Sequence, residues 1–165
     1  MPVFLFGKDN SLRRKDREVT NREDILRIVN DAKYLHLALF DGEYPYIVSM
    51  HYGFVDSDPI VFYMHSAKEG HKIDLIRSNC NAAITLECNV ILQESSNACS
   101  YTSTFSSIFA KGKVFLVEDN EEKKKALELI MKNQSGKHFD IKDNMASSVA
   151  IIKFVATELS AKEKK

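Results

Sequence analysis

The stretch "YLHLALFDGEYPYIVSMHYGF", residues 34–54, decides the fold class because polar and apolar residues alternate on both sides of a turn signal. Three leucines at every second position, beginning at Leu35, share one side, which is the period of a half-buried β-strand. The pair Asp-Gly at 41–42 favours a tight hairpin turn, since both turn residues need positive φ. Alternation then resumes over residues 45–54. The stretch therefore predicts two antiparallel strands joined by a hairpin.

The rest of the chain repeats this pattern, with short links between most of the predicted strands. Strands are predicted at residues 34–40, 45–54, 60–65, 82–88, 101–118 and 148–159, where 101–118 is one long strand or two interrupted near Gly112. Helices are predicted at residues 21–33, with Thr20 and Glu23 as a capping box, at 69–78, and from Asp119 onward. Residues 89–100 fit either an extension of the sheet or a loop. Because hairpins outnumber crossovers, we expect a mainly β protein with peripheral helices, in an antiparallel sheet or barrel.

Length and charge predict one domain with no electrostatic preference for nucleic acid or membrane. The 165 residues favour a single domain over 1–165, with an N-terminal arm at 1–19 and a frayed, charged tail at 160–165. Basic and acidic residues balance at 23 each, so no strong net field directs the protein to a polyanion.

The cysteines predict reduced thiols rather than a framework of disulfides. Cys80, Cys88 and Cys99 are an odd number without a CxxC pair, and no HExxH motif occurs, so we expect no disulfide framework and no metal site. The apolar patch at residues 3–6 is too short for a signal peptide or a membrane span. These observations together favour the cytoplasm.

The stretch "FYMHSAKEGHKIDLI", residues 62–76, places hydroxyl, imidazole and ammonium groups where a strand ends and a helix begins. Ser66 and Glu69 fit a capping box, and the helix start with Lys72 beside it could hold a phosphate. A plain N-cap and a solvated lysine explain the same pattern. The preceding His65 could donate a proton, or it could be a hydrogen-bonded structural histidine.

Several pieces of the chain, in order, resemble the pyridoxamine 5′-phosphate oxidase-like flavoproteins, and within them the Nim-type 5-nitroimidazole reductase or resistance proteins. The pieces are "RRKDREVT" at 13–20, "LALFDGEYPYIVSMHYGF" at 37–54, "FYMHSAKEGHKIDLIRSN" at 62–79 and "FSSIFAKGKVFLVEDNEEKKKALELIM" at 105–131. The resemblance implies an FMN-binding split β-barrel and a homodimer with flavin at the subunit interface. FAD is possible in place of FMN.

The resemblance also implies a set of flavin contacts. The strand "PYIVSM" would run beside the flavin ring, and the junction after residue 64 would reach the ring, the ribityl chain and the phosphate. Phe105 and Ser107 stand at the Tyr and Ser positions of the family's Tyr-x-Ser-Val segment, with contacts expected across the dimer. The implied contacts are Ile47, Val48, Ser49, Met50, His65, Ser66, His71, Lys72, Phe105 and Ser107, with His71 and Lys72 at the phosphate.

The activity implied by the resemblance is a flavin-dependent oxidoreductase that reduces a small acceptor such as a nitroimidazole. His65 would be the catalytic proton donor or the group that orients the acceptor. The C-terminal segment "FVATELSAKEKK" has neither Trp nor Arg, unlike the segment that binds pyridoxine phosphate in the oxidases, so that substrate is not expected. Two alternatives remain: a flavin-binding storage or sensor protein without turnover, and a barrel interaction module without cofactor.

Overall fold

The sheet of this protein contains eight antiparallel strands in the computed structural model, which describes residues 14–165. Residues 1–13 of the predicted arm at 1–19 lie outside the described residues. The strands are β1 (Glu18–Val19), β2 (Leu35–Asp41), β3 (Tyr44–Met50), β4 (Tyr52–Val55), β5 (Val61–Ser66), β6 (Asn81–Gln93), β7 (Thr102–Val117) and β8 (Ala150–Lys164). The helices are α1 (Arg22–Asp31), α2 (His71–Ser78), α3 (Asn120–Ser135) and α4 (Asp143–Ser148), and two 3-10 turns span Lys15–Arg17 and Ala98–Ser100.

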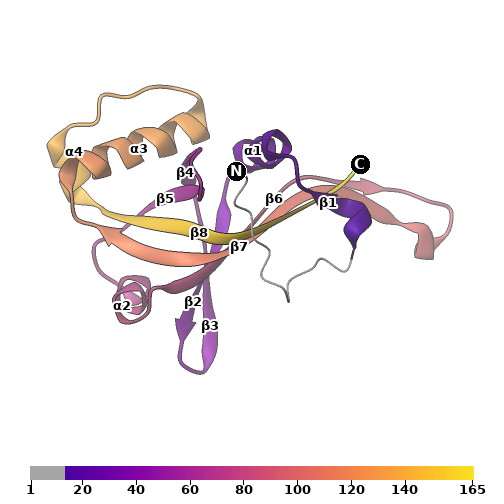
Figure 1. Cartoon of the computed structure of the whole chain (residues 1–165), viewed down its shortest axis with the longest axis horizontal. Helices are drawn as coiled ribbons and strands as arrows, with labels where there is room; N and C mark the ends of the chain where they lie inside the picture. The colour runs from indigo at the N-terminus through magenta and orange to yellow at the C-terminus, as the bar shows by residue number, and fades with distance from the viewer. Residues whose placement is uncertain (1–13) are drawn as a thin grey trace.

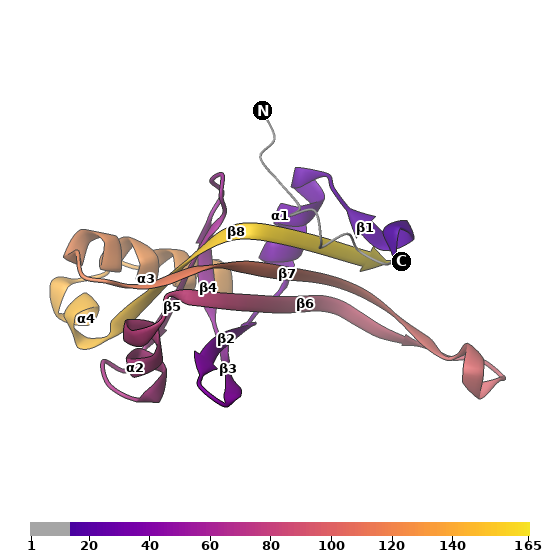
Figure 2. The ribbon, with the colours of Figure 1, turned by 60° about the horizontal axis from the view of Figure 1, so that its bottom comes forward.

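The strand order is β3-β2-β6-β7-β8-β5-β4, with β1 added to β8. The long strands β6, β7 and β8 run side by side through the whole molecule, and α3 and α4 lie together near one end of them (Figures 1 and 2). The sheet does not close, since β3 and β4 remain its two edges. The prediction of a mainly β antiparallel fold with peripheral helices is therefore confirmed.

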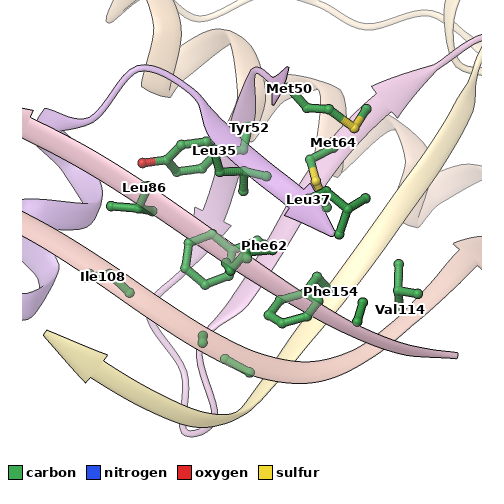
Figure 3. Close-up of a cluster of buried hydrophobic side chains, with 14 of the residues drawn as sticks. Leu35, Leu37, Met50, Tyr52, Phe62, Met64, Leu86, Ile108, Val114 and Phe154 are labelled. Carbon is green, nitrogen blue, oxygen red and sulfur yellow. The ribbon is translucent and has the colours of Figure 1, made fainter. Parts of the chain in front are cut away.

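The core lies on one face of the curved sheet, and the predicted alternation decides which residues enter it. Leu35, Leu37 and Leu39 of β2 are all buried, as expected. Figure 3 shows Leu35 and Leu37 among aromatic and aliphatic side chains from β4, β5 and β8, including Phe62 and Phe154, whose ring centroids are 6.3 Å apart. Side chains at the intervening positions of β2, β3, β6 and β7 form the opposite surface, here called the outer face. It carries His36, Ala38, Phe40, Ile47, Ser49, Ala83, Thr85, Glu87, Ser107 and Phe109.

Helix α3 packs against β4 so closely that one position of the strand must be glycine. A Cβ atom on Gly53 would lie 2.3 Å from the carbonyl carbon of Leu129 in α3. Asn133 and Gln134, near the end of the same helix, donate hydrogen bonds from their side-chain amides to the carbonyl oxygen of Tyr52 at 3.0 and 3.1 Å. The absence of a side chain at residue 53 thus lets the helix backbone dock on the edge strand.

The start of α3 is fixed to the sheet by a half-buried carboxylate. Glu122 accepts hydrogen bonds from the Tyr63 hydroxyl at 2.6 Å and from the Lys153 ammonium at 2.8 Å. These two donors hold the pKa of Glu122 below its ordinary value of 4.5. The helix therefore contacts both β5 and β8 through one side chain.

The C-terminal residues are part of the sheet, so the prediction of a frayed tail at 160–165 is wrong. Strand β8 continues to Lys164, where its backbone pairs with both β7 and β1. Glu163 anchors it by accepting hydrogen bonds from Arg27 at 2.8 Å and Ser106 at 3.0 Å. The charged composition of these residues suggested that they extend into solvent, but their charged side chains have partners on neighbouring elements.

Other boundaries differ from the prediction for local reasons. Asn21, not Thr20, caps α1, because its side chain accepts the amides of Glu23 and Asp24. The predicted strand at 45–54 divides at His51 into β3 and β4, which belong to opposite edges of the sheet. Residues 101–118 are one strand with a register shift at Lys111–Gly112, and β6 extends through a bulge near Asn89 to Gln93. Helix α4 was not predicted.

Candidate functional site

The junction between β5 and α2 brings together several of the predicted site residues, but its capping differs from the expectation. Ser66 is the last residue of β5, where it pairs with Ala150, and it is only 8% exposed. The helix begins at His71, its N-cap residue is Gly70 with φ of 122°, and no side chain caps it. The predicted capping box of Ser66 and Glu69 is therefore wrong, because strand pairing holds the serine outside the helix.

His65 lies in a cationic environment. Partial burial of its imidazole lowers its pKa below the ordinary value of 6.5, and the nearby charges of His51 and Lys72 lower it further. His51 lies in the break between β3 and β4, and its Nδ1 is 3.0 Å from the carbonyl oxygen of Lys33. Residues from three separate segments thus converge at the start of α2 and favour an anion there. The sequence pattern alone did not assign His51 to this site.

His65 and Ser66 occupy opposite sides of β5, since successive side chains of a strand alternate. The side chain of Ser66 is buried on the side of Met64 and Phe62, whereas His65 is exposed. A ligand beside the imidazole of His65 can therefore meet the side chain of Lys72 and the backbone of Ser66.

His71 connects α2 to the hairpin of β2 and β3. Its Nε2 lies 2.7 Å from a carboxylate oxygen of Asp41, and its ring meets the ring of Tyr46 edge to face at 5.0 Å. The second ring nitrogen remains for another partner. The predicted phosphate contact is thus held beside the hairpin by an acid and an aromatic ring.

Strand β3 presents its four predicted contacts in two ways. Ile47, which is 60% exposed, and Ser49 project from the outer face, whereas Met50 is buried and Val48 packs against the core. Because β3 is an edge strand, its free side also offers unpaired backbone groups. Ile47 and Ser49 can therefore contact a ligand through their side chains, and Val48 and Met50 only through their backbone.

A series of hydrogen-bonded side chains crosses the outer face beside Ser49. The Ser49 hydroxyl oxygen is 3.0 Å from Nδ1 of His36 on β2, and Nε2 of His36 is 3.2 Å from a carboxylate oxygen of Glu87 on β6. The ring of Tyr34 packs edge to face against His36 at 5.5 Å. No motif in the sequence indicated this arrangement, because its members come from three strands.

Phe105 and Ser107 lie far from the junction within one chain. In the sheet register, His65 is opposite Ile151, which is opposite Val117 of β7. Ser107 precedes Val117 by ten residues on that strand, a distance of roughly 33 Å along it. Within one protomer Ser107 is instead opposite Glu87 of β6, on the outer face that also carries Ser49, and both Phe105 and Ser107 are separated from the junction along β7.

The outer face is also hollowed and apolar near the hairpin of β2 and β3. A cavity of about 660 Å³ is lined there by residues of β2, β3, β6 and β7, among them Phe40, Tyr44, Ala83 and Phe109. Phe40 and Tyr44 are 62% and 71% exposed, far more than is usual for large apolar side chains in a core. The face therefore has space and surface for an additional partner.

Comparison with protein families decides the classification. Residues 21–163 match the family described as pyridoxamine 5′-phosphate oxidase. The chain belongs to this family. The match covers the junction, β3 and the segment around Ser107 together. The predicted relationship is therefore confirmed.

Solved structures support the same classification. A candidate 5-nitroimidazole antibiotic resistance protein from Bacteroides thetaiotaomicron VPI-5482 is 30% identical, with a TM-score of 0.75 over 88% of this chain and 86% of its own. The flavocytochrome Anf3 from Azotobacter vinelandii also has a TM-score of 0.75, at 14% identity over 94% of this chain and 72% of its own. A FAD and heme binding protein from Mycobacterium smegmatis has the same TM-score at 10% identity, over 90% and 74%. The last two share the fold alone.

Other comparisons and searches add less. No curated protein matches the chain significantly. Over residues 14–165, no helix is long and apolar enough to cross a membrane. Nor do the described residues contain a group of three or more His, Cys, Asp or Glu side chains that could hold a metal ion.

Proposed function

We propose that this protein is a flavin-dependent oxidoreductase that binds FMN and reduces a small acceptor such as a nitroimidazole or another nitro compound. The observation that carries the proposal is the cationic junction of His51, His65 and Lys72, adjoining an edge strand in a chain of this family. The 30% identity to a candidate 5-nitroimidazole resistance protein supports the choice of acceptor.

The residues at the junction fit a flavin phosphate. Lys72 supplies an ammonium donor, and a phosphate accepts such charged hydrogen bonds strongly. The start of α2 carries amides that no side chain caps, which also favours an anion. The planar ring would lie along β3, where Ile47 and Ser49 provide side chains and the edge backbone provides hydrogen-bonding groups. The residues present therefore fit both ends of the cofactor.

The functional form is proposed to be a homodimer joined through the outer face. Ser107 lies roughly 33 Å along β7 from the level of the junction in its own chain, and Phe105 lies further along, so their predicted contact with the cofactor at the junction is assigned to the second copy. Exposed Phe40, Ile47 and Phe109 on the outer face offer apolar area for that contact.

Bound flavin supplies the electron transfer, and the protein supplies binding, orientation and proton handling. His65 is the group proposed to handle the proton. Burial lowers the pKa of His65, so its protonated imidazole releases a proton to an acceptor more readily than that of an ordinary histidine. The nearby His51 and Lys72 lower this pKa further and thereby favour release of the proton. A cytoplasmic location belongs to the same proposal, since Cys80, Cys88 and Cys99 are all free.

The test begins with the absorbance spectrum of the purified protein after incubation with FMN. We expect flavin bands, a mass of the released ligand equal to that of FMN rather than FAD, and bleaching by a reductant that reverses when a nitroaromatic compound is added. Bleaching without recovery would indicate storage or sensing, and a colourless protein after incubation would overturn the proposal.

A further inference from the structure

His36 and Glu87 act on Ser49, at the segment where the proposed flavin ring lies. We propose that these two residues fix the Ser49 hydroxyl as a hydrogen-bond acceptor for an N–H group at the edge of that ring, so that His36 is a positioning residue of the binding site. This inference rests on the proposed function, because it assigns the chemistry of one contact in the same site.

The direction of the hydrogen bonds follows from the carboxylate. A carboxylate can only accept, so when the imidazole of His36 is neutral its proton lies on Nε2, 3.2 Å from Glu87. Nδ1 is then an acceptor, and the group 3.0 Å from it is the Ser49 hydroxyl, which must donate. The single proton of that hydroxyl is consumed by His36. The remaining lone pairs of the serine oxygen can only accept from a ligand.

The register of the sheet holds these hydrogen-bonded side chains in place. His36 and Ser49 are directly opposite each other on β2 and β3, and Thr85 is opposite His36 on the other side. Glu87 follows Thr85 by two positions, so it shares the same face and reaches His36 diagonally. The ring of Tyr34 restrains the imidazole from a further side. Backbone pairing thus fixes three strands, and with them all three side chains.

The location of Ser49 connects this series of hydrogen bonds to the proposed flavin. Ser49 is exposed on β3 between Val48 and Met50, whose side chains face the core. Its neighbour Ile47 is also exposed on the outer face, and His51, two positions further, acts on His65. The serine oxygen is therefore the polar side-chain group of β3 that faces the proposed ring.

The test is a mutant cycle with FMN as the probe, measured by quenching of flavin fluorescence. Ser49→Ala is expected to weaken FMN binding about three- to tenfold, the range of one neutral hydrogen bond. His36→Phe, which keeps a ring but removes both nitrogens, should cause a similar loss. In the Ser49→Ala background it should cause no further loss, because both changes remove the same contact. Both variants should also shift the visible absorbance bands of bound FMN by the same amount.

Controls separate this positioning role from a loss of folding. His138→Phe changes a histidine that also faces a carboxylate, Glu128, but lies beyond α3, and it should leave binding and spectrum unchanged. Should His36→Phe fail to fold, the exposed Ser49→Ala and the milder Glu87→Gln still test the contact. Equal affinity and equal spectra for Ser49→Ala and wild type would overturn the inference while the proposed function stands. Failure of the wild type to bind FMN would overturn both.

Discussion

The guanidinium of Arg27 donates a hydrogen bond to the carboxylate of Glu163 at 2.8 Å, although 136 residues separate them in the chain. Glu163 is 14% exposed and also accepts a hydrogen bond from Ser106. This pair joins α1, which follows the N-terminal turn, to the last residues of β8. The charged contact adds to the backbone pairing of β1 with β8, and both connect the two ends of the described chain.

Glu163→Gln should lower the free energy of unfolding by about 1–2 kcal/mol, since Arg27 is partly exposed and keeps other acidic partners. Arg27 and Ser106 hold the pKa of Glu163 below 4.5 in the folded state. Its stabilising contribution is therefore present above the unfolded pKa and is lost as the pH falls through the folded pKa. Urea denaturation at pH 7 and pH 3 measures this, and the difference between variant and wild type should shrink at pH 3. Lys165→Ala, at an exposed position beside Glu163, is the control with little expected effect.

Gly53→Ala should destabilise the protein by about 3 kcal/mol or more, because the new methyl group overlaps the backbone of α3 at Leu129. Thermal unfolding measures the loss. Gly136→Asn tests whether any glycine replacement does the same. Gly136 has open space around it and a left-handed conformation that asparagine tolerates. The melting temperature of the Gly136→Asn variant should therefore stay close to that of the wild type. Similar melting temperatures for Gly53→Ala and wild type would contradict the close docking.

Lys72→Ala should weaken FMN binding by about 1.5–3 kcal/mol, the range for a hydrogen bond that involves a charged group. Titration with FMN at constant ionic strength provides the measurement. Lys137→Ala removes the same charge from an exposed position after α3 and should leave the affinity unchanged. Equal losses of FMN affinity in the two variants would show that Lys72 acts only through the overall charge of the protein and not through a direct contact.

His65→Ala should reduce the rate of acceptor reduction far more than it reduces flavin retention. Because a proton donor must carry its proton and the pKa of His65 lies below 6.5, the wild-type rate should rise as the pH falls from 8 and level off only below that pKa. The variant should lack this rise. Steady-state rates and flavin content across the pH series supply both readouts, with His138→Ala as a matched histidine control. Unchanged turnover in His65→Ala would remove the residue from the mechanism.

Phe109→Glu should convert the proposed dimer to a monomer and thereby weaken flavin binding, because it introduces a charge into the apolar outer face. Phe139→Glu is a matched control, since Phe139 and Phe109 are 44% and 43% exposed but Phe139 lies in the segment after α3. Light scattering coupled to size exclusion gives the mass of each variant. A dimeric Phe109→Glu protein would show that this face is not the interface.

Patterns local in sequence predicted most of the fold. The alternating leucines that begin at Leu35 enter the core as expected, because the period of a strand alone determines which side faces inward. The tail at 160–165 failed because composition does not reveal the partners of its charges. Glu163 is ordered by Arg27 and Ser106, neither of which is near it in the chain.

The candidate site was predictable from the sequence only where its residues follow one another in the chain. The cluster around Lys72 was visible because strand end and helix start are consecutive, although strand pairing moved the cap from Ser66 to Gly70. His51 and the contacts of His36 were not visible. They depend on the break between β3 and β4 and on the register between three strands, which no local pattern records.

The central place of β8 has a consequence for how this protein folds. β5 and its hairpin partner β4 join the rest of the sheet only through β8, which is far from both of them in the sequence. Their docking therefore depends on non-local pairing, which is slow because a long loop must close first. Until β8 has paired on both sides, β5 and β7 carry unpaired edges, a state that is prone to association with other chains.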